Sequence, residues 1–330
     1  MDLTFLGTSA GTPTKVRNVT ALALQHGNSR GWYLIDCGEG TQHQILRTRH
    51  SLVRLRAIFI THVHGDHCYG LPGLLASASM AGRKEKLYIV APGPIKTMIE
   101  AVLLASDTRL DYELAFIDVG ALGFRWEDQA VRVTTVPLSH RVPCYAYVFT
   151  ENDVPKQLLT DRLEESGVKA GPVWGRLQKG ENVTLEDGRL ILSDEYTAIR
   201  RRPRRVVVGG DNDNPDLLQE ACAEAQLLVH EATYTQEVAD RVGPAPQHSS
   251  AALVARFAES VGLPHLVLTH FSSRYQMMSA GGPQVSEIAV EARRYYRGNL
   301  HLAEDFATYC LNTDMSLSAP ATVGSGSFRS

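Results

Sequence analysis

The stretch Thr61–His67 reads THVHGDH and places three histidines and one aspartate within six positions. In an extended segment, residues two apart point to the same side, so His62 and His64 can bind one metal ion. The glycine that follows permits a sharp turn, after which Asp66 and His67 face a second position. Imidazole nitrogens and carboxylate oxygens are common zinc ligands. Because such a cluster rarely arises for packing reasons, the stretch predicts half of a two-metal site in a metal-dependent hydrolase.

Further candidate ligands stand where apolar runs end. His140, Asp211 and His270 each follow a short β-branched or apolar run that is predicted to form a strand. Catalytic groups are common at strand ends, because loops present them above a rigid sheet. Taken singly, each of the three is equally consistent with a capping or surface residue. Together they complete the pair of sites: His62, His64 and His140 for one metal, Asp66, His67 and His270 for the other, and Asp211 as the bridging carboxylate.

Length and composition indicate one large α/β domain. The chain has 330 residues, 44% of them hydrophobic, which is enough for a large buried core. Short apolar runs alternate with helical patterns such as Ser249–Val261, as is typical of a layered α/β architecture. We expect a hydrolase domain at 1–313, an inserted arm at 151–188 and a disordered tail at 314–330. The arm is Gly/Pro-rich around Gly167–Pro172 and carries few residues that could fill a core.

Charge and cysteine usage exclude several classes of protein. A formal net charge of −3 does not favour a protein that coats nucleic acid nonspecifically. The five cysteines never form a CxxC pair, which argues against a disulfide framework or a cysteine zinc ribbon. The chain shows neither a secretory signal pattern nor an apolar run of bilayer length. We therefore expect a reduced, cytoplasmic protein with no membrane association.

The HxHxDH pattern of residues 62–67 resembles the signature of the metallo-β-lactamase superfamily. This resemblance implies an α/β fold, a four-layer αββα sandwich with the metals at one edge. The motif alone leaves the substrate open, because the superfamily acts on lactams, thioesters, lactones and nucleic acids.

Other segments resemble the ribonuclease Z family, the endonucleases that mature transfer RNA 3′ ends. The resemblance covers roughly residues 2–313. Gly171–Leu177 is similar to the tip of that family's flexible arm, which grips the transfer RNA elbow. The further matching segments are Phe5–Gly11, the PxKxRN loop Pro13–Asn18, the DCGEGTQ segment Asp36–Gln42, His64–Leu75, the HEAT loop His230–Thr233, the HST-like loop His248–Ser250, and Leu268–Tyr275.

One position departs from the family pattern. The family usually shows Gly-Asp-Thr at the bridging carboxylate, whereas this chain has Gly210-Asp211-Asn212. The aspartate still fits the ligand position, and Asn212 is expected to change a hydrogen bond behind it. The arm also has few lysines at its tip.

The resemblance implies partners and cofactors. It implies two Zn²⁺ per subunit, with Mn²⁺ or another divalent metal as the alternative, and no nucleotide cofactor. The substrate it implies is a transfer RNA precursor. It also implies a homodimer in which the arm of one subunit serves the site of the other.

Candidate roles follow from the chemistry of phosphodiester cleavage, which needs an activated water and a proton for the leaving 3′ oxygen. Asp66 is the candidate base, and His248 is the candidate general acid, with Glu231 orienting it. The alternative for Glu231 is a helix N-terminal charge or a loop salt bridge, and the alternative for His248 is a structural place beside Ser249 at the N-cap of the helix that follows. The candidate RNA contacts are Lys15, Arg17, Asn18 and Arg274 near the site and Gly171 and Pro172 in the arm.

Several polar residues are left outside the predicted site. Asp36, Thr61 and His43 are predicted to support the structure or the ligands. The arginine-rich segment 200–205 could attract RNA phosphates, but a solvated loop fits it as well.

Two other functions stay open at this point. A small-molecule phosphodiesterase, or another hydrolase on the same scaffold, is the alternative enzyme. A catalytically silent RNA-binding or scaffold protein is the alternative outside enzymes, and it would be expected to have lost metal ligands.

Overall fold

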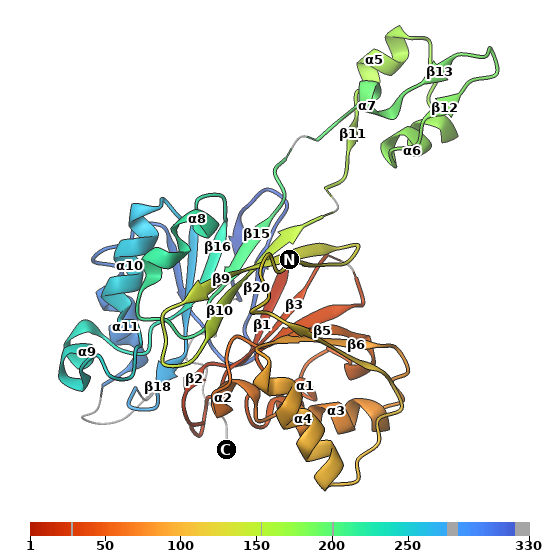
Figure 1. Cartoon of the computed structure of the whole chain (residues 1–330). Coiled ribbons are helices and arrows are strands. Elements are labelled where there is room, and N and C mark those ends of the chain that lie inside the picture. The colour runs from red at the N-terminus through yellow and green to blue at the C-terminus, as the bar shows by residue number, and fades with distance from the viewer. Residues whose placement is uncertain (28, 153, 200, 276–282, 321–330) are drawn as a thin grey trace, which may run out of the picture.

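A computed structural model describes residues 1–27, 29–152, 154–199, 201–275 and 283–320 (Figure 1). Two mixed sheets lie face to face. The first has the order β21-β20-β1-β3-β4-β5-β6-β7. Its strands are β1 (Asp2–Gly7), β3 (Ala21–Gln25), β4 (Trp32–Ile35), β5 (Leu55–Phe59), β6 (Leu87–Ala91), β7 (Leu114–Asp118), β20 (Thr308–Leu311) and β21 (Leu317–Ser318).

The second sheet has the order β19-β17-β16-β15-β10-β9-β8. Its strands β15, β16, β17 and β19 run parallel, whereas β8, β9 and β10 are joined in antiparallel pairs. The bounds are β8 (Trp126–Glu127), β9 (Val131–Leu138), β10 (Cys144–Glu151), β15 (Arg205–Val208), β16 (Leu227–Glu231), β17 (His265–Thr269) and β19 (Asn299–Leu302). A two-stranded sheet of β2 (Ser9–Ala10) and β18 (Phe271–Ser272) joins the two halves near one edge.

Helices cover the outer face of each sheet, which completes four layers (Figure 1). Beside the first sheet lie α1 (Thr41–Ile45), α2 (Gly65–Cys68), α3 (Leu71–Met80) and α4 (Pro94–Ala105). Beside the second lie α8 (Gln219–Cys222), α9 (Gln236–Val242), α10 (Ala251–Ser260) and α11 (Val285–Ala292), and short 3₁₀ turns span Leu52–Arg54 and Pro215–Leu218. This order of helix, sheet, sheet and helix is the one that the resemblance to the metallo-β-lactamase superfamily implies.

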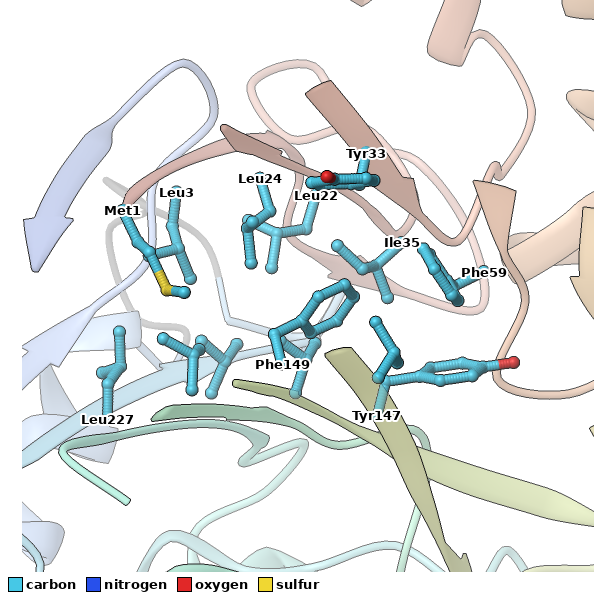
Figure 2. Packing of buried hydrophobic residues seen from close by; sticks show 14 of the residues in the cluster. Met1, Leu3, Leu22, Leu24, Tyr33, Ile35, Phe59, Tyr147, Phe149 and Leu227 are labelled. Carbon is cyan, nitrogen blue, oxygen red and sulfur yellow. The ribbon is translucent and has the colours of Figure 1, made fainter. Parts of the chain in front are cut away.

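The two sheets enclose the central core (Figure 2). In β4, Tyr33 and Ile35 point into this core, while Trp32 and Leu34 belong to the cluster under the helices of the first sheet. Both faces of the strand are therefore buried, which explains why WYLI is apolar throughout instead of alternating. Phe59 packs edge-on against Tyr147 and Phe149 of the opposite sheet, with ring centroids 5.2 Å apart in each pair. These ring contacts join β5 to β10 across the central core.

The inserted arm projects from the body between β10 and β15 (Figure 1). Its stalk is the antiparallel pair of β11 (Gln157–Leu158) and β14 (Thr197–Ala198). Beyond the stalk lie α5 (Thr160–Glu165), α6 (Pro172–Gln178), α7 (Ser193–Tyr196) and the hairpin of β12 (Val183–Thr184) and β13 (Leu190–Ile191).

Two boundary predictions need correction. The arm does not end at residue 188, because β14 pairs with β11 and both belong to its stalk. The arm also has a small core of its own, made by Leu163, Val168, Leu177, Val183 and Ile191. The tail does not begin at residue 314, because β21 pairs with β20 and Leu317 is buried. Residues 321–330 lie outside the described residues.

Glu151 anchors the arm to the body. Its carboxylate is 1% exposed and accepts hydrogen bonds from Arg204 (2.8 Å) and Arg201 (2.9 Å). Burial raises the pKa of Glu151, but hydrogen bonds from His26, Arg201 and Arg204 override it and hold that pKa well below the usual range. The two arginines belong to the chain returning from the arm, so this buried cluster joins both ends of the arm. The side chains of Arg201 and Arg204 are therefore not part of a solvated loop, which was one of the two interpretations of residues 200–205.

Removing this carboxylate is expected to destabilise the fold. Glu151→Ala leaves the buried Arg204 guanidinium without its partner, which typically costs about 3–5 kcal/mol. The pair of Glu224 with Arg205 lies 3.1 Å apart, and Glu224 is 70% exposed. Glu224→Ala is therefore the matched control, and it is expected to cost less than about 1 kcal/mol. Urea unfolding near neutral pH measures both. Equal losses would contradict the anchoring role.

The Glu151 contribution also depends on pH. Its folded-state pKa lies below the ordinary value of 4.5, so the stabilisation is present above that pH and shrinks as the pH falls. The difference in unfolding free energy between the protein and Glu151→Ala is therefore expected to narrow below pH 4.5.

Candidate metal centre

The predicted ligands meet at one edge of the sandwich. His62 and His64 follow β5, Asp211 follows β15, and His270 follows β17. Because β15, β16 and β17 run parallel, the residues after them reach the same edge. Close packing determines the residue before Asp211: a Cβ on Gly210 would lie 2.6 Å from Cys144 Sγ and 2.7 Å from Thr61 Cβ.

One group of side chains surrounds a first metal position. His64 Nδ1 lies 3.1 Å from both His62 Nε2 and His140 Nε2. Asp211 Oδ2 lies 3.6 Å from His62 Nε2 and 3.8 Å from His140 Nε2. Ligand atoms of the four residues all lie within 4.8 Å of one another. The group therefore matches the first predicted set, with His64 presenting Nδ1 and the other two histidines presenting Nε2.

A second group lies beside the first. His67 Nε2 is 3.2 Å from His270 Nε2, and Asp66 Oδ2 is 3.4 Å from each of them. Asp211 Oδ1 is also 3.4 Å from each of these two nitrogens. Asp211 therefore offers one oxygen to each group, which is the geometry expected of a bridging carboxylate. His248, Asp211 and His270 form a third possible ligand group.

Hydrogen bonds behind the histidines orient the rings. Asp36 Oδ2 lies 2.7 Å from His67 Nδ1, and Thr61 Oγ1 lies 3.0 Å from His62 Nδ1. The second nitrogen of His140 lies 3.0 Å from the carbonyl oxygen of Gln247. In metal sites such partners set the tautomer and aim the free nitrogen at the ion. Asp36 and Thr61 thus support the ligands, as predicted.

His270 reaches the site through an unusual backbone conformation. Its φ is +57°, in the left-handed region that non-glycine residues rarely adopt. Thr233 Oγ1 donates to the His270 carbonyl and lies 3.0 Å from His270 Nδ1. Thr233 was not singled out from the sequence, although it is the threonine of the HEAT segment.

The donor set fits a pair of divalent metal ions. Burial and the neighbouring histidines hold the pKa of His62 well below its usual range, so this ring is neutral and able to bind metal. Burial raises the pKa of Asp66, but His67 and His270 override it and keep that pKa low. Mixed imidazole and carboxylate ligands suit zinc and also manganese. The edge is a metal site by its chemistry.

Glu231 and His248 lie next to this edge. His248 Nδ1 is 3.1 Å from both Glu231 oxygens and 3.8 Å from Asp211 Oδ2. Burial lowers the pKa of His248, but the Glu231 carboxylate overrides it and raises that pKa to about 9. Glu231 is fully enclosed at the end of β16 and also accepts a hydrogen bond from Thr233. The structure therefore brings the predicted pair together.

Asn212, the departure from the family pattern, is buried behind the site. Its N–H donates to Glu231 Oε1 (2.7 Å), and its Oδ1 accepts from the Ser139 N–H (3.2 Å). Its Nδ2 lies 3.2 Å from His230 Nε2. The asparagine therefore ties the loops after β9 and β15 to the end of β16 and holds the Glu231 carboxylate in place.

The predicted RNA contacts are scattered. Lys15 is exposed in a turn that is closed by a hydrogen bond from the Thr14 N–H to the Arg17 carbonyl. Asn18 Nδ2 donates to the Glu39 carbonyl at 2.9 Å. Arg274 is exposed, with its guanidinium 5.7 Å from the Tyr234 ring centroid.

Gly171 and Pro172 lie at the start of α6 in the arm, away from the metal edge (Figure 1). The structure therefore does not bring these two residues to the site of their own chain.

The prediction that Arg17 contacts RNA needs correction. Its side chain is buried, and Nη1 donates to Thr8 Oγ1 and to the Ala303 carbonyl, both at 2.7 Å. The guanidinium also stacks over the Phe271 ring, 5.0 Å from its centroid. An arginine held in this way braces the loop from inside and has no surface to offer RNA.

No helix among the described residues is long and apolar enough to cross a membrane.

Comparisons with known proteins agree with this geometry. A family model described as "Anti-Pycsar protein Apyc1" matches residues 1–119, which hold the THVHGDH stretch but not the arm. The chain is 58% identical over 317 residues to a protein named Ribonuclease Z from Marinobacter nauticus, covering 96% of this chain and 98% of the relative.

Solved structures share the architecture. The crystal structure of human tRNase Z, short form, has a TM-score of 0.65 at 26% identity, covering 94% of this chain and all of that one. The metallo-β-lactamase fold protein YhfI from Bacillus subtilis has a TM-score of 0.62 at 17% identity, covering 93% and 98%. These likenesses confirm the predicted α/β fold, the four-layer metallo-β-lactamase sandwich.

Proposed function

The chain belongs to the ribonuclease Z family, and on this basis we propose that it is an endonuclease that removes 3′ trailers from transfer RNA precursors. The observation that carries the proposal is the double ligand set joined by Asp211, with the His248–Glu231 pair beside it. The high identity to a Ribonuclease Z over nearly the whole chain directs this general hydrolytic site towards RNA.

We propose two Zn²⁺ ions at this edge, with Mn²⁺ or another divalent ion as the alternative. Two such ions would supply an activated water and neutralise charge on the phosphodiester. The proposed ligands are His62, His64 and His140 for one ion, Asp66, His67 and His270 for the other, and Asp211 between them.

The residues of the chain handle the protons. We propose that Asp66, whose Oδ2 accepts a hydrogen bond from the Gly11 N–H at 2.7 Å, takes a proton from the attacking water. The water oxygen bonds to phosphorus, and the bond from phosphorus to the 3′ oxygen breaks. His248 donates a proton to that 3′ oxygen, while Glu231 holds its ring through Nδ1. The products are a transfer RNA with a 3′ hydroxyl and a trailer with a 5′ phosphate.

The position of the arm supports a homodimer. The arm leaves at the end of β10, whereas the start of β10 lies beside the metal edge, where the Tyr145 N–H donates to Thr61 O. Eight residues of β10 separate the two ends by about 23 Å at about 3.3 Å per residue. An arm on the far edge is poorly placed to serve its own metal site. We therefore propose that it holds RNA whose 3′ end lies in the site of a second copy.

Replacing the arm is expected to separate RNA binding from chemistry. Gln157 and Ala198 are paired across the stalk, so a short Gly/Ser linker can replace residues 157–198. Cleavage of a transfer RNA precursor is expected to fall by at least about tenfold, which is the loss of about 1.4 kcal/mol of binding. Hydrolysis of bis(4-nitrophenyl) phosphate is expected to stay unchanged. Equal losses on both substrates would contradict a docking role.

Mixing variants tests the exchange of arms between subunits. Subunits without the arm, mixed with Asp211→Ala subunits, can form hybrids with one intact arm opposite one intact metal site. Recovery of activity above either variant alone supports action in trans. No recovery from a mixture shown to contain hybrids would count against it.

One assay tests the function as a whole. The zinc-loaded protein is incubated with a 3′-extended transfer RNA precursor and, separately, with bis(4-nitrophenyl) phosphate. Cleavage after the mature 3′ end, abolished by a chelator, is expected. Turnover of the small ester without RNA cleavage would favour a small-molecule phosphodiesterase, and turnover of neither would favour a silent scaffold. The cytoplasmic location stays a prediction.

A further inference from the structure

A small cavity opens beside the second metal position. Its volume is about 330 Å³, within the range of small-molecule sites. Its lining includes Gly11, Pro13, Glu39, Asp66 and Tyr69. The Gly11 N–H donates to Asp66 Oδ2 at 2.7 Å, so the wall of the cavity is tied directly to a ligand of the metal site.

Tyr69 is an exposed aromatic residue at this cavity. It follows α2, and its N–H donates to the Gly65 carbonyl at 2.9 Å. The side chain is 66% exposed, and within the described parts of the chain its hydroxyl has no hydrogen-bond partner. A Cβ on Gly65 would lie 2.3 Å from the ring, so the ring rests against the backbone of the metal-binding turn. The rest of the ring is left free beside the reaction site.

The chemistry of the cavity suits a nucleobase better than a phosphate. Exposed aromatic rings are stacking surfaces for the bases of single-stranded RNA. The exposed Glu39 lines the cavity with a carboxylate, which repels phosphates and accepts hydrogen bonds from amino groups. The backbone of Glu39 is held in place, because its carbonyl accepts a hydrogen bond from Asn18 Nδ2 at 2.9 Å.

We propose that this cavity binds the base of one of the two nucleotides flanking the scissile bond. The base stacks on Tyr69, and its exocyclic amino group donates to the Glu39 carboxylate. Cytosine, adenine and guanine carry such an amino group, whereas uracil does not, so the cavity favours the first three. The proposal rests on the proposed endonuclease function and names Tyr69 as a positioning residue for it.

A double-mutant cycle tests the stacking. Precursors are made with an abasic site at either flanking nucleotide, and kcat/KM is measured with the zinc-loaded full chain and with Tyr69→Ala. At one of the two positions, the abasic site is expected to lower kcat/KM about tenfold, in line with the usual strength of base stacking. Tyr69→Ala is expected to lower cleavage of the intact precursor by a similar factor and to lose nothing further on that abasic precursor.

Matched variants separate stacking from other effects. Tyr69→Phe keeps the ring and is expected to retain the full rate. Tyr295→Ala removes a part-exposed tyrosine whose ring lies 4.2 Å from Arg256, and it is expected to change nothing. Equal losses from Tyr69→Ala on intact and abasic precursors would overturn the proposal, as would failure of Tyr69→Phe to restore the rate.

Glu39→Gln tests the recognition of the amino group. The protein itself is expected to cleave a precursor with cytosine at the sensitive position several-fold faster than one with uracil, and Glu39→Gln is expected to reduce that ratio. An unchanged ratio overturns this part of the proposal. Absence of any precursor cleavage by the unaltered protein would instead refute the proposed function, so the two failures can be told apart.

Discussion

Asp211→Ala is expected to lower the cleavage of a 3′-extended transfer RNA precursor by at least about a thousandfold. Loss of a group that only supports a metal ligand typically costs 10–100-fold. A larger loss is expected for Asp211, because its own oxygens face both groups of candidate ligands. Oδ1 faces His67 and His270, and Oδ2 faces His62 and His140. Its removal takes a ligand from both groups at once and leaves the two histidine sets without their shared anion.

Metal content is the second readout of this variant. The zinc-loaded protein is expected to hold two equivalents and Asp211→Ala one or fewer, as measured by mass spectrometry of the metals after gel filtration. Asp216→Ala removes an exposed carboxylate five positions on and is the control. Near-normal cleavage by Asp211→Ala with both equivalents retained would refute the bridging role.

The cluster of candidate ligands could be predicted in part because much of its geometry is local. His62, His64, Asp66 and His67 lie in one short segment, where the alternation of an extended chain and one turn place them. Asp211 and His270 could be found because parallel strands deliver the residues after them to a common edge. The layered fold followed from the same alternation of apolar runs and helical patterns.

Other features depend on contacts between distant parts of the chain. From the sequence, Arg17 is predicted to be an exposed loop cation that contacts RNA. In the structure its side chain is buried, and it donates hydrogen bonds to Thr8 Oγ1 and to the Ala303 carbonyl. Asp36 and His270 have positive φ angles of +58° and +57°. Aspartate and histidine adopt this region more often than most non-glycine residues, but the residue type alone does not say at which positions they do so. Such conformations persist only where the surroundings hold them, as Thr233 does for His270.

The arm illustrates a similar limit. Its core residues are separated by charged positions and short turns, so no helical or strand period reveals them. Leu163 and Leu177 are nonetheless fully buried, and both belong to the hydrophobic cluster of the arm. The far boundary was missed because β14 is two residues long and becomes a strand only by pairing with β11.

His248→Ala is expected to lower kcat for the transfer RNA precursor by about 10²–10⁴-fold, the usual contribution of a general acid. The imidazole lies 3.1 Å from both Glu231 oxygens, which leaves Nε2 as the nitrogen that can reach a substrate. His43→Ala, which removes an exposed histidine of α1, is the matched control and is expected to leave kcat unchanged.

The choice of substrate separates a general acid from a metal ligand, because His248 could also join Asp211 and His270 around an ion. A ribose 3′ oxygen needs a proton to leave, whereas 4-nitrophenolate is a far weaker base and leaves without one. As a general acid, His248 matters for the precursor and much less for bis(4-nitrophenyl) phosphate, so His248→Ala is expected to retain most of its rate on the small ester. As a ligand, it would affect both substrates alike and lower the zinc content. Equal losses of rate on the two substrates, together with a lower zinc content, would therefore show that His248 is a metal ligand and not the proton donor.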